Sequence, residues 1–166
     1  MFILLKKPTA VLANKMKILF VCSANICRSP TAEGIMRQLC PGAQIDSAGL
    51  CAYDGDAPDV YAITCAAQHG IDISKLRSRP IRADDFAFFD LILTMDASSA
   101  KYLEQLRPQG DKSYQKAKIE NLAAYAGVLQ IPNPYGTSGF EAVYELIEKA
   151  CRNLAVKAQE NLASKA

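Results

Sequence analysis

The order of apolar and polar positions along the chain predicts strands that alternate with helices. Residues 17–21 form a short continuous apolar run, and its length and the loop after it favour a strand over a buried helix. Further strands are predicted at 44–48 and 91–95, and the weakest pattern predicts a fourth at 118–125. This order indicates an α/β fold with a parallel sheet that helices cover on both faces.

Apolar residues at helical spacing predict four helices, of which the last has the clearest pattern. Gly70 supplies the stop of the second helix, because glycine readily adopts the left-handed conformation of a helix C-terminus. The helices and their expected buried residues are 30–39 (Ala32, Ile35, Met36 and Leu39), 59–69 (Val60, Ile63, Thr64 and Ala67), 97–106, and 140–163 (Phe140, Val143, Ile147, Ala150, Cys151, Leu154, Ala158 and Leu162).

Length and composition indicate one domain. The chain has 166 residues, half of them apolar, which is enough for a proper core. The formal net charge of +2 is too small to predict nucleic-acid binding, and no basic run dominates a segment. Six cysteines at irregular spacing, without a recognisable export signal, indicate free thiols in a reducing cytoplasm rather than a disulfide framework.

Residues 1–15 precede the first predicted strand and are expected to form a flexible extension, with an edge strand as the alternative. Their apolar stretch is too short for a membrane span, and Lys6-Lys7 follows it, whereas the charges of a signal peptide precede the apolar part. Met16 resembles an alternative start. Residues 16–166 are therefore expected to form the single domain, and no membrane association is predicted.

A nucleophile and a fixed cation lie at the two ends of one loop. Five residues separate Cys22 from Arg28, between the first predicted strand and the first predicted helix. Successive N–H groups of such a loop and the positive end of the helix can bind a phosphate-sized anion, and the Arg28 fork matches two phosphate oxygens. The same charges favour the thiolate of Cys22, which is the attacking form. Ser29 is expected to cap the helix, with Pro30 in its first turn; a buried cysteine without a function is the alternative.

The sequence around this loop resembles a known family. The signature of the low-molecular-weight protein tyrosine phosphatases matches residues 21–33, which read Val-Cys-Ser-Ala-Asn-Ile-Cys-Arg-Ser-Pro-Thr-Ala-Glu. Further motifs of the family follow in its order, so that the resemblance covers about residues 16–162; they lie at 45–49, 69–71, 89–96 and 131–135.

The resemblance implies a three-layer α/β fold, in which helices flank a four-stranded parallel sheet and the phosphate-binding loop follows the first strand. It implies Cys22 as the nucleophile, Arg28 as the cation and no cofactor. A metal site is not expected, because one histidine and no second cysteine pair leave too few ligands. The remaining members of the phosphate-binding loop are Ser23, Ala24, Asn25, Ile26, Cys27 and Ser29.

Several polar residues are expected to support this loop. Asn25 tolerates the left-handed conformation that a tight loop needs, and the resemblance implies that it bonds to Ser29, Ser47 and His69; an ordinary loop residue is the alternative. His69 is the one histidine of the chain, and we expect a structural role at a helix C-terminus rather than catalysis. Asp96 is expected either to cap the helix at 97–106 or to serve the active site.

Two pairs of residues take roles from the resemblance alone. Tyr53 and Tyr135 stand where the family places side chains that flank the aromatic substrate, although the position of Tyr53 varies among members; surface aromatics are the alternative. The family also implies that Cys22 and Cys27 form a disulfide under oxidants, which makes the enzyme redox-sensitive. Plain packing of Cys27 beneath the loop is the alternative.

The chain departs from the family at the general acid. The family has an aspartate just before Pro-Tyr, where this sequence has Asn133. An amide cannot give a proton to a leaving phenolate or take one from water, and general acid–base catalysis contributes about 10²–10⁴-fold. We therefore expect a weakened phosphatase, or one in which Asp54 or Asp56 supplies the proton.

These patterns predict a protein tyrosine phosphatase that acts through a cysteinyl-phosphate intermediate, with phosphotyrosine proteins as substrates and phosphate or other oxyanions as ligands. Residues 131–144 resemble bacterial members paired with tyrosine kinases of exopolysaccharide export, which implies such a kinase as partner. Members acting on phosphoarginine tend to have threonine in place of Ile26, which favours phosphotyrosine as the substrate.

One alternative function is a catalytically damped phosphotyrosine-binding module. Arsenate reductase on the same fold has less support, because no cysteine lies between residue 80 and Cys151.

Overall fold

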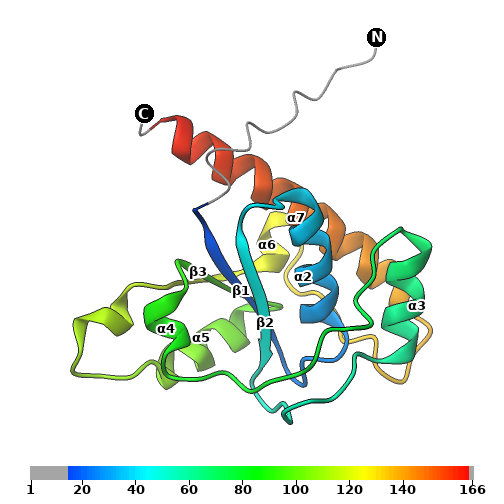
Figure 1. Ribbon diagram of the computed structural model, residues 1–166, viewed down its shortest axis with the longest axis horizontal. Helices are drawn as coiled ribbons and strands as arrows, with labels where there is room; N and C mark the ends of the chain where they lie inside the picture. Colours follow the sequence, from blue (N-terminus) through cyan, green and yellow to red (C-terminus); the bar gives the residue numbers. More distant parts are fainter. Residues whose placement is uncertain (1–14, 165–166) are drawn as a thin grey trace.

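A four-stranded parallel sheet forms the centre of the protein, as the sequence predicts. The computed structural model describes residues 15–164, so the predicted extension over 1–15 lies outside the described residues apart from Lys15. In chain order, the strands are β1 (Lys17–Cys22), β2 (Gln44–Gly49), β3 (Leu91–Thr94) and β4 (Lys118–Asn121). Their order across the sheet is β2-β1-β3-β4, and all neighbours are parallel (Figure 1).

Strand β1 lies between β2 and β3 and is buried on both faces. Ile18 and Phe20 belong to the core on one face of the sheet, and Leu19 and Val21 belong to the core on the other. This two-sided burial explains why the run is continuously apolar instead of alternating. The strand order reverses at β1, and ligands of open α/β sheets bind beyond the carboxyl end of a strand at such a point.

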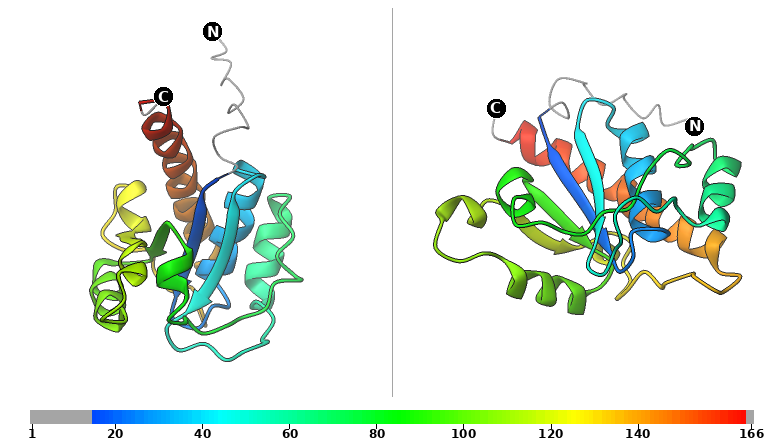
Figure 2. Two further views of the ribbon diagram at one scale, coloured as in Figure 1. Left: turned by 60° about the vertical axis from the view of Figure 1, so that its left-hand side comes forward. Right: turned by 60° about the horizontal axis from the view of Figure 1, so that its bottom comes forward.

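Helices cover both faces, which confirms the predicted three layers (Figure 2). The long α7 runs along one face with α2, α3 and α6, and the opposite face carries the short α4 and η1 together with α5. The bounds are α2 (Arg28–Leu39), α3 (Val60–Gln68), α4 (Asp85–Phe88), α5 (Ala97–Leu106), η1 (Lys112–Gln115), α6 (Leu122–Tyr125) and α7 (Phe140–Ala163).

The predictions for the longer helices are largely confirmed. Helices α5 and α7 have the predicted bounds, and the predicted inner residues of α2 and α7 are buried or half-buried, except that the side chain of Leu162 lies outside the described part. The predicted cap of α2 is wrong. The helix begins at Arg28, its N-cap residue is Cys27, and Ser29 is fully buried in the first turn beside Pro30.

The predicted inner face of α3 is wrong for Val60, Thr64 and Ala67, which are exposed, whereas Ile63 is half-buried against the core. The helix buries the small residues Ala62, Cys65 and Ala66, whereas Val60 is 64% exposed and Tyr61 is 67% exposed. Small side chains on the inner face allow α3 to pack closely against its neighbours α2 and α7. Its N-cap is Asp59, whose side chain accepts the N–H of Tyr61, and this cap precedes the predicted apolar spacing.

The fourth strand is shorter than predicted. β4 ends at Asn121, whose side chain accepts the N–H of Ala123 and caps the short helix α6, so residues 122–125 are helical. Helices α4 and η1 are not predicted from the sequence. Each has four residues, which is too few for a periodic apolar pattern.

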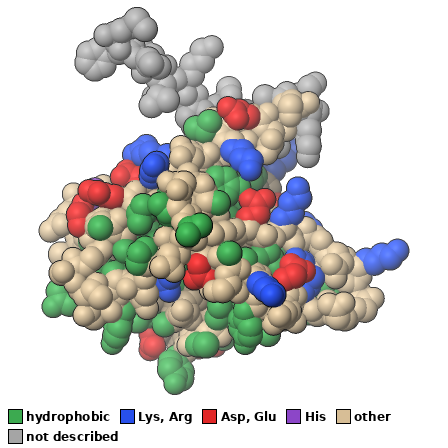
Figure 3. All heavy atoms as spheres, turned by 180° about the vertical axis from the view of Figure 1, so that it is seen from behind, with side chains coloured by type: hydrophobic (Ala, Val, Ile, Leu, Met, Phe, Trp, Pro, Cys, Tyr) green, Lys and Arg blue, Asp and Glu red, His purple; other side chains and the backbone are tan. Residues whose placement is uncertain are grey.

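Charged side chains are mixed on the surface. On the face in Figure 3, lysines and arginines alternate with aspartates and glutamates and form no continuous basic patch. This distribution agrees with the small net charge of the chain. Within residues 15–164, none of the helices has both the length and the apolar character that a membrane span requires.

Candidate active site

Two carbonyl groups of the loop between β1 and α2 bond to segments outside the loop. The carbonyls of Ser23 and Ile26 accept the N–H groups of Cys51 and Asp59, each at 2.8 Å. Within the described chain, none of the backbone N–H groups of residues 23–28 donates a hydrogen bond to another residue. Successive N–H groups that are free in this way form a concave site for an anion.

Asn25 holds the loop in this shape. Its φ of 57° is left-handed, as predicted, and the described chain has no other non-glycine residue with positive φ. Its Nδ2 donates to Ser29 Oγ at 2.8 Å and to Ser47 Oγ at 2.9 Å, as the resemblance implies. The expected bond to His69 is absent, because Asn25 Oδ1 accepts the N–H of Arg79 at 3.0 Å instead. Three hydrogen bonds, two of them buried and one partly buried, thus fix the left-handed Asn25.

Arg28 lies beside this concave site and is 7% exposed. Its Nη1 donates to the carbonyl of Ile131 at 3.1 Å, and its Nη2 has a long contact of 3.4 Å to Ser23 Oγ. Its Nε is buried and has no hydrogen-bond partner among the described residues. Nε and Nη2 form one side of the guanidinium fork, which suits two oxygens of an anion.

Cys22 ends β1 with its side chain 5% exposed and its Sγ 3.0 Å from Ser29 Oγ. Because Asn25 donates to that oxygen, the Ser29 proton has two acceptors, the Cys22 sulfur and the carbonyl of Ala48 at 3.4 Å, and donation over the shorter distance to the sulfur stabilises a thiolate. Cys27 differs, since burial and the charge of Asp59 raise the pKa of its thiol to about 12. Of the two loop cysteines, Cys22 is therefore the candidate nucleophile.

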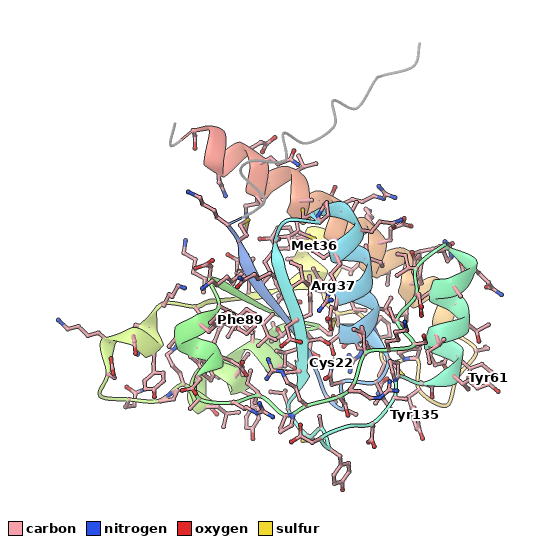
Figure 4. The ribbon with its side chains drawn as sticks, in the orientation of Figure 1. Cys22, Met36, Arg37, Tyr61, Phe89 and Tyr135 are labelled. Carbon is pink, nitrogen blue, oxygen red and sulfur yellow. The ribbon has the colours of Figure 1, made fainter. Side chains whose placement is uncertain are left out.

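A cavity of about 340 Å³ opens over the loop. Tyr53 and Tyr135 lie at its wall and are 79% and 61% exposed, so the cavity combines an anion site with aromatic surfaces. In Figure 4, Cys22 lies at the carboxyl end of β1, and Tyr135 lies in the loop before α7 at the same end of the molecule. The lining residues are Cys22, Ser23, Ala24, Ile26, Cys27, Arg28, Cys51, Tyr53, Asp56, Asn133 and Tyr135.

The segment that carries Asn133 is fixed to Arg28 and to Met95, the residue that follows β3. The N–H of Ile131 donates to the carbonyl of Met95 at 2.8 Å, and the carbonyl of Ile131 accepts from Arg28. Asn133 lines the cavity two residues later, and its Oδ1 accepts the N–H of Tyr135 at 3.2 Å. The segment therefore places an amide at the wall of the anion site.

Comparison with known proteins agrees with this geometry. The family model described as low molecular weight phosphotyrosine protein phosphatase matches residues 17–165. The chain belongs to this family. Members of the family are phosphomonoester hydrolases, and phosphatase activity is the function that the family assigns.

The match to known relatives extends over nearly the whole length of each relative. The low molecular weight phosphotyrosine protein phosphatase of Homo sapiens is 40% identical over 152 residues, which cover 85% of this chain and 94% of that protein. The structure of Vibrio vulnificus Wzb in complex with benzylphosphonate matches with a TM-score of 0.77 and 32% identity, and covers 86% of this chain and 98% of that one. Escherichia coli Wzb in complex with sulphate matches with a TM-score of 0.76 and 31% identity, over 85% and 96% of the two chains.

His69 and Asp96 do not line the cavity of this family member. His69 is the C-cap residue of α3, and its Nε2 lies 2.7 Å from Glu141 Oε1. Asp96 caps α5 by accepting the N–H of Ser99 at 2.7 Å. Burial opposes ionisation of Asp96, but its hydrogen bonds and the charge of Arg28 lower its pKa. Both residues thus lie at helix ends, which agrees with the structural role expected for His69 and with one of the two roles expected for Asp96.

Arg79 supports the loop but is not identified by sequence reasoning. Its guanidinium bonds to Asp46 at 2.9 Å and to Asp85 at 3.0 Å, which holds its backbone N–H against Asn25. Asp46 is the one residue whose position in the sequence points to these ion pairs of Arg79. It lies in a predicted strand, where aspartate is rare.

Glu33 is a second supporting residue without a predicted role. It is 2% exposed, accepts a hydrogen bond from Ser47 Oγ at 2.5 Å and pairs with Arg37 at 2.5 Å. Burial raises its pKa, although Ser47 and Arg37 act in the opposite direction. Through Ser47, this carboxylate orients one of the hydroxyls that hold Asn25.

Proposed function

We propose that this chain hydrolyses phosphotyrosine in proteins through a cysteinyl-phosphate intermediate on Cys22. One observation carries the proposal: the Cys22 thiol, the free N–H groups of residues 23–28 and the unpartnered Nε of Arg28 meet at one cavity. A nucleophile in the middle of an oxyanion site is the arrangement that covalent transfer of a phosphoryl group to the protein requires.

In the first step, the sulfur–phosphorus bond forms while the bond from phosphorus to the tyrosine oxygen breaks. The loop N–H groups and Arg28 stabilise the charge that spreads over the equatorial oxygens, and this contribution needs no proton transfer. The rings of Tyr53 and Tyr135 flank the substrate ring, which supports an aryl rather than an alkyl phosphate.

In the second step, water attacks phosphorus and releases Cys22. Neither step receives a proton transfer from Asn133, because an amide is not an acid or base at neutral pH. Asp56 lines the cavity, whereas Asp54 pairs with Arg82 at 3.4 Å outside it. Asp56 is therefore the carboxylate available for proton transfer, and we infer a phosphatase weakened relative to members with the family's aspartate.

A second candidate function is a phosphotyrosine-binding module. It is supported by Asn133 at the cavity wall, since loss of the general acid preserves binding while it slows turnover. Catalytic release of phosphate from an aryl phosphate, measured over many turnovers per chain, separates the enzyme from the module. Substrate held without release would support the module.

The substrate protein that we propose is a bacterial tyrosine kinase, on the basis of the resemblance of residues 131–144 to members paired with such kinases. The six cysteines are all free, which supports a reducing compartment such as the cytoplasm.

Arg28→Lys tests the oxyanion site. We expect it to lower kcat/KM for an aryl phosphate by about 10²–10³-fold, the effect of losing one donor to a transition-state oxyanion. A lysine ammonium is a point charge and cannot make the two parallel bonds of the fork. Steady-state rates and inhibition by inorganic phosphate provide the measurement.

Arg152→Lys is the matched control, because Arg152 is 60% exposed and pairs with Glu148 on α7, away from the cavity. It should leave both rates and phosphate inhibition near those of the unmodified chain. Normal kinetics in Arg28→Lys would remove Arg28 from the site.

Mild peroxide is expected to inactivate the enzyme reversibly. Peroxide oxidises Cys22 to a sulfenic acid, and the thiol of Cys27 then displaces water to form a disulfide. Both side chains belong to one loop and line one cavity, which favours this pairing. Dithiothreitol should restore activity, and peptide mapping should find the Cys22–Cys27 bond.

Cys27→Ser should make the inactivation irreversible, because the sulfenic acid is then open to further oxidation. Cys51 lines the same cavity and is exposed, so it is the competing partner. Mapping of Cys22 to Cys51, or to any cysteine other than Cys27, would contradict the prediction.

A further inference from the structure

A second group of reactive side chains lies outside the phosphate-binding cavity. Cys65, His69 and Glu141 bring a thiol, an imidazole and a carboxylate within 4.8 Å of one another. Glu141 joins the other two, with Oε1 2.7 Å from His69 Nε2 and Oε2 accepting from Cys65 Sγ at 3.2 Å. The proposed hydrolysis uses none of these three groups.

Two helices create this group. Cys65 lies in α3 and His69 is its C-cap residue, and their spacing of four residues places both on one side of the helix. Glu141 lies in the first turn of α7, which packs against α3 (Figures 1 and 2, orange). One histidine and no second cysteine pair predict no metal site, but Cys65 and His69 lie one helical turn apart and Glu141 of α7 joins them.

The surroundings suit a cation. Tyr144 stacks on the His69 ring, with 3.9 Å between ring centres and 14° between planes, and so fixes the orientation of the imidazole. The side chains of His69 and Glu141 are 32% and 52% exposed, which lets an ion enter from solvent, while Cys65 is buried. Glu145 adds a further negative charge near Cys65.

We propose that Cys65, His69 and Glu141 form a Zn²⁺ site with water as the fourth ligand. Tetrahedral Zn²⁺, with bonds of about 2.3 Å to sulfur and about 2.0–2.2 Å to nitrogen and oxygen, holds its ligand atoms roughly 3.3–3.7 Å apart. The three ligand atoms lie within 4.8 Å of one another, which is close to this spacing. The Cys65 proton passes to solvent as the sulfur–zinc bond forms, and no electron is transferred. Thiolate and imidazole together favour Zn²⁺ over Mg²⁺ or Ca²⁺.

The bound ion would cross-link α3 to α7 next to the phosphate-binding loop. Cys65 and Cys27 line one small cavity, together with Pro134 and Phe140 from the segment that follows Asn133. Since the folded chain assembles the three ligands and the unfolded chain does not, Zn²⁺ should raise the Tm.

The test uses Co²⁺, which takes the place of Zn²⁺ and reports thiolate ligation by a ligand-to-metal charge-transfer band. The full chain carries Cys22→Ser in all samples, so that the active-site thiol does not bind the ion. We expect one Co²⁺ per chain, the charge-transfer band, tetrahedral d–d bands and displacement by Zn²⁺. Absence of the charge-transfer band would overturn the proposal and leave a hydrogen-bonded contact between α3 and α7.

Ligand variants decide where the ion binds. Cys65→Ser should remove the band and weaken binding at least about 100-fold, since even partners of ligands contribute 10–100-fold. Glu141→Gln keeps the shape of the side chain and the thiol, and should weaken binding while metal-free Tm changes little. Cys40→Ser, a buried cysteine elsewhere, should bind Co²⁺ as the parent does. A band that persists in Cys65→Ser, or equal affinity in Glu141→Gln, would overturn the assignment.

Discussion

Replacement of Cys22 by serine is expected to abolish turnover of aryl phosphates, with a loss in kcat on the order of 10⁶-fold, as in enzymes whose nucleophile is removed. A serine hydroxyl stays protonated at neutral pH, and its hydrogen-bond partner at this position would be another hydroxyl, that of Ser29, which is no general base. The N–H groups of residues 23–28 and Arg28 are unchanged, so binding of inorganic phosphate should persist. Initial rates and calorimetric titration with phosphate measure the two quantities.

The control is Cys40→Ala, which removes a buried thiol just beyond the end of α2. It should retain turnover, because Cys40 does not line the cavity. Rapid quenching of the unmodified chain should also trap phosphate on Cys22, and this label should be absent from Cys22→Ser. Turnover by Cys22→Ser would contradict a covalent mechanism.

The features predicted from the sequence are those that a local pattern determines. β1 is a short apolar run because both of its faces are buried. The 24 residues of α7 repeat one apolar face over many turns, so the period identifies both the helix and its bounds. The left-handed Asn25 follows from the tightness of a loop between a strand and a helix.

Other features depend on contacts between segments that are distant in the sequence. The residue that bonds to Asn25 Oδ1 is Arg79, 54 positions later, and His69 finds its partner 72 positions away at Glu141. The inner face of α3 depends on the surface that it packs against, so the largest apolar residues of its sequence need not lie inside. No local periodicity contains this information, whereas the family signature brings Cys22 and Arg28 together correctly.

Asn133→Asp is expected to increase turnover of phosphotyrosine by about 10²–10⁴-fold, which is the contribution of general acid–base catalysis. Asn133 already lines the cavity, and its segment is fixed through Ile131 to Arg28 and to Met95, the residue after β3, so the new carboxyl should lie beside the leaving oxygen. Breakdown of the phosphoenzyme should improve too, because the carboxylate can take a proton from water. Single-turnover and steady-state rates separate the two steps.

The size of the gain should depend on the leaving group. Tyrosine, with a phenol pKa of about 10, needs protonation as its bond to phosphorus breaks, whereas an acidic nitrophenol leaves as the anion. Across a series of aryl phosphates, the ratio of rates for Asn133→Asp and the unmodified chain should therefore fall as the leaving group becomes more acidic. With poor leaving groups the variant should lose rate as the pH rises through the pKa of the new carboxyl, because only its protonated form acts as the acid. Equal rates throughout the series would mean that another group already supplies the proton, and Asp56, the carboxylate that lines the cavity, would be the residue to replace next.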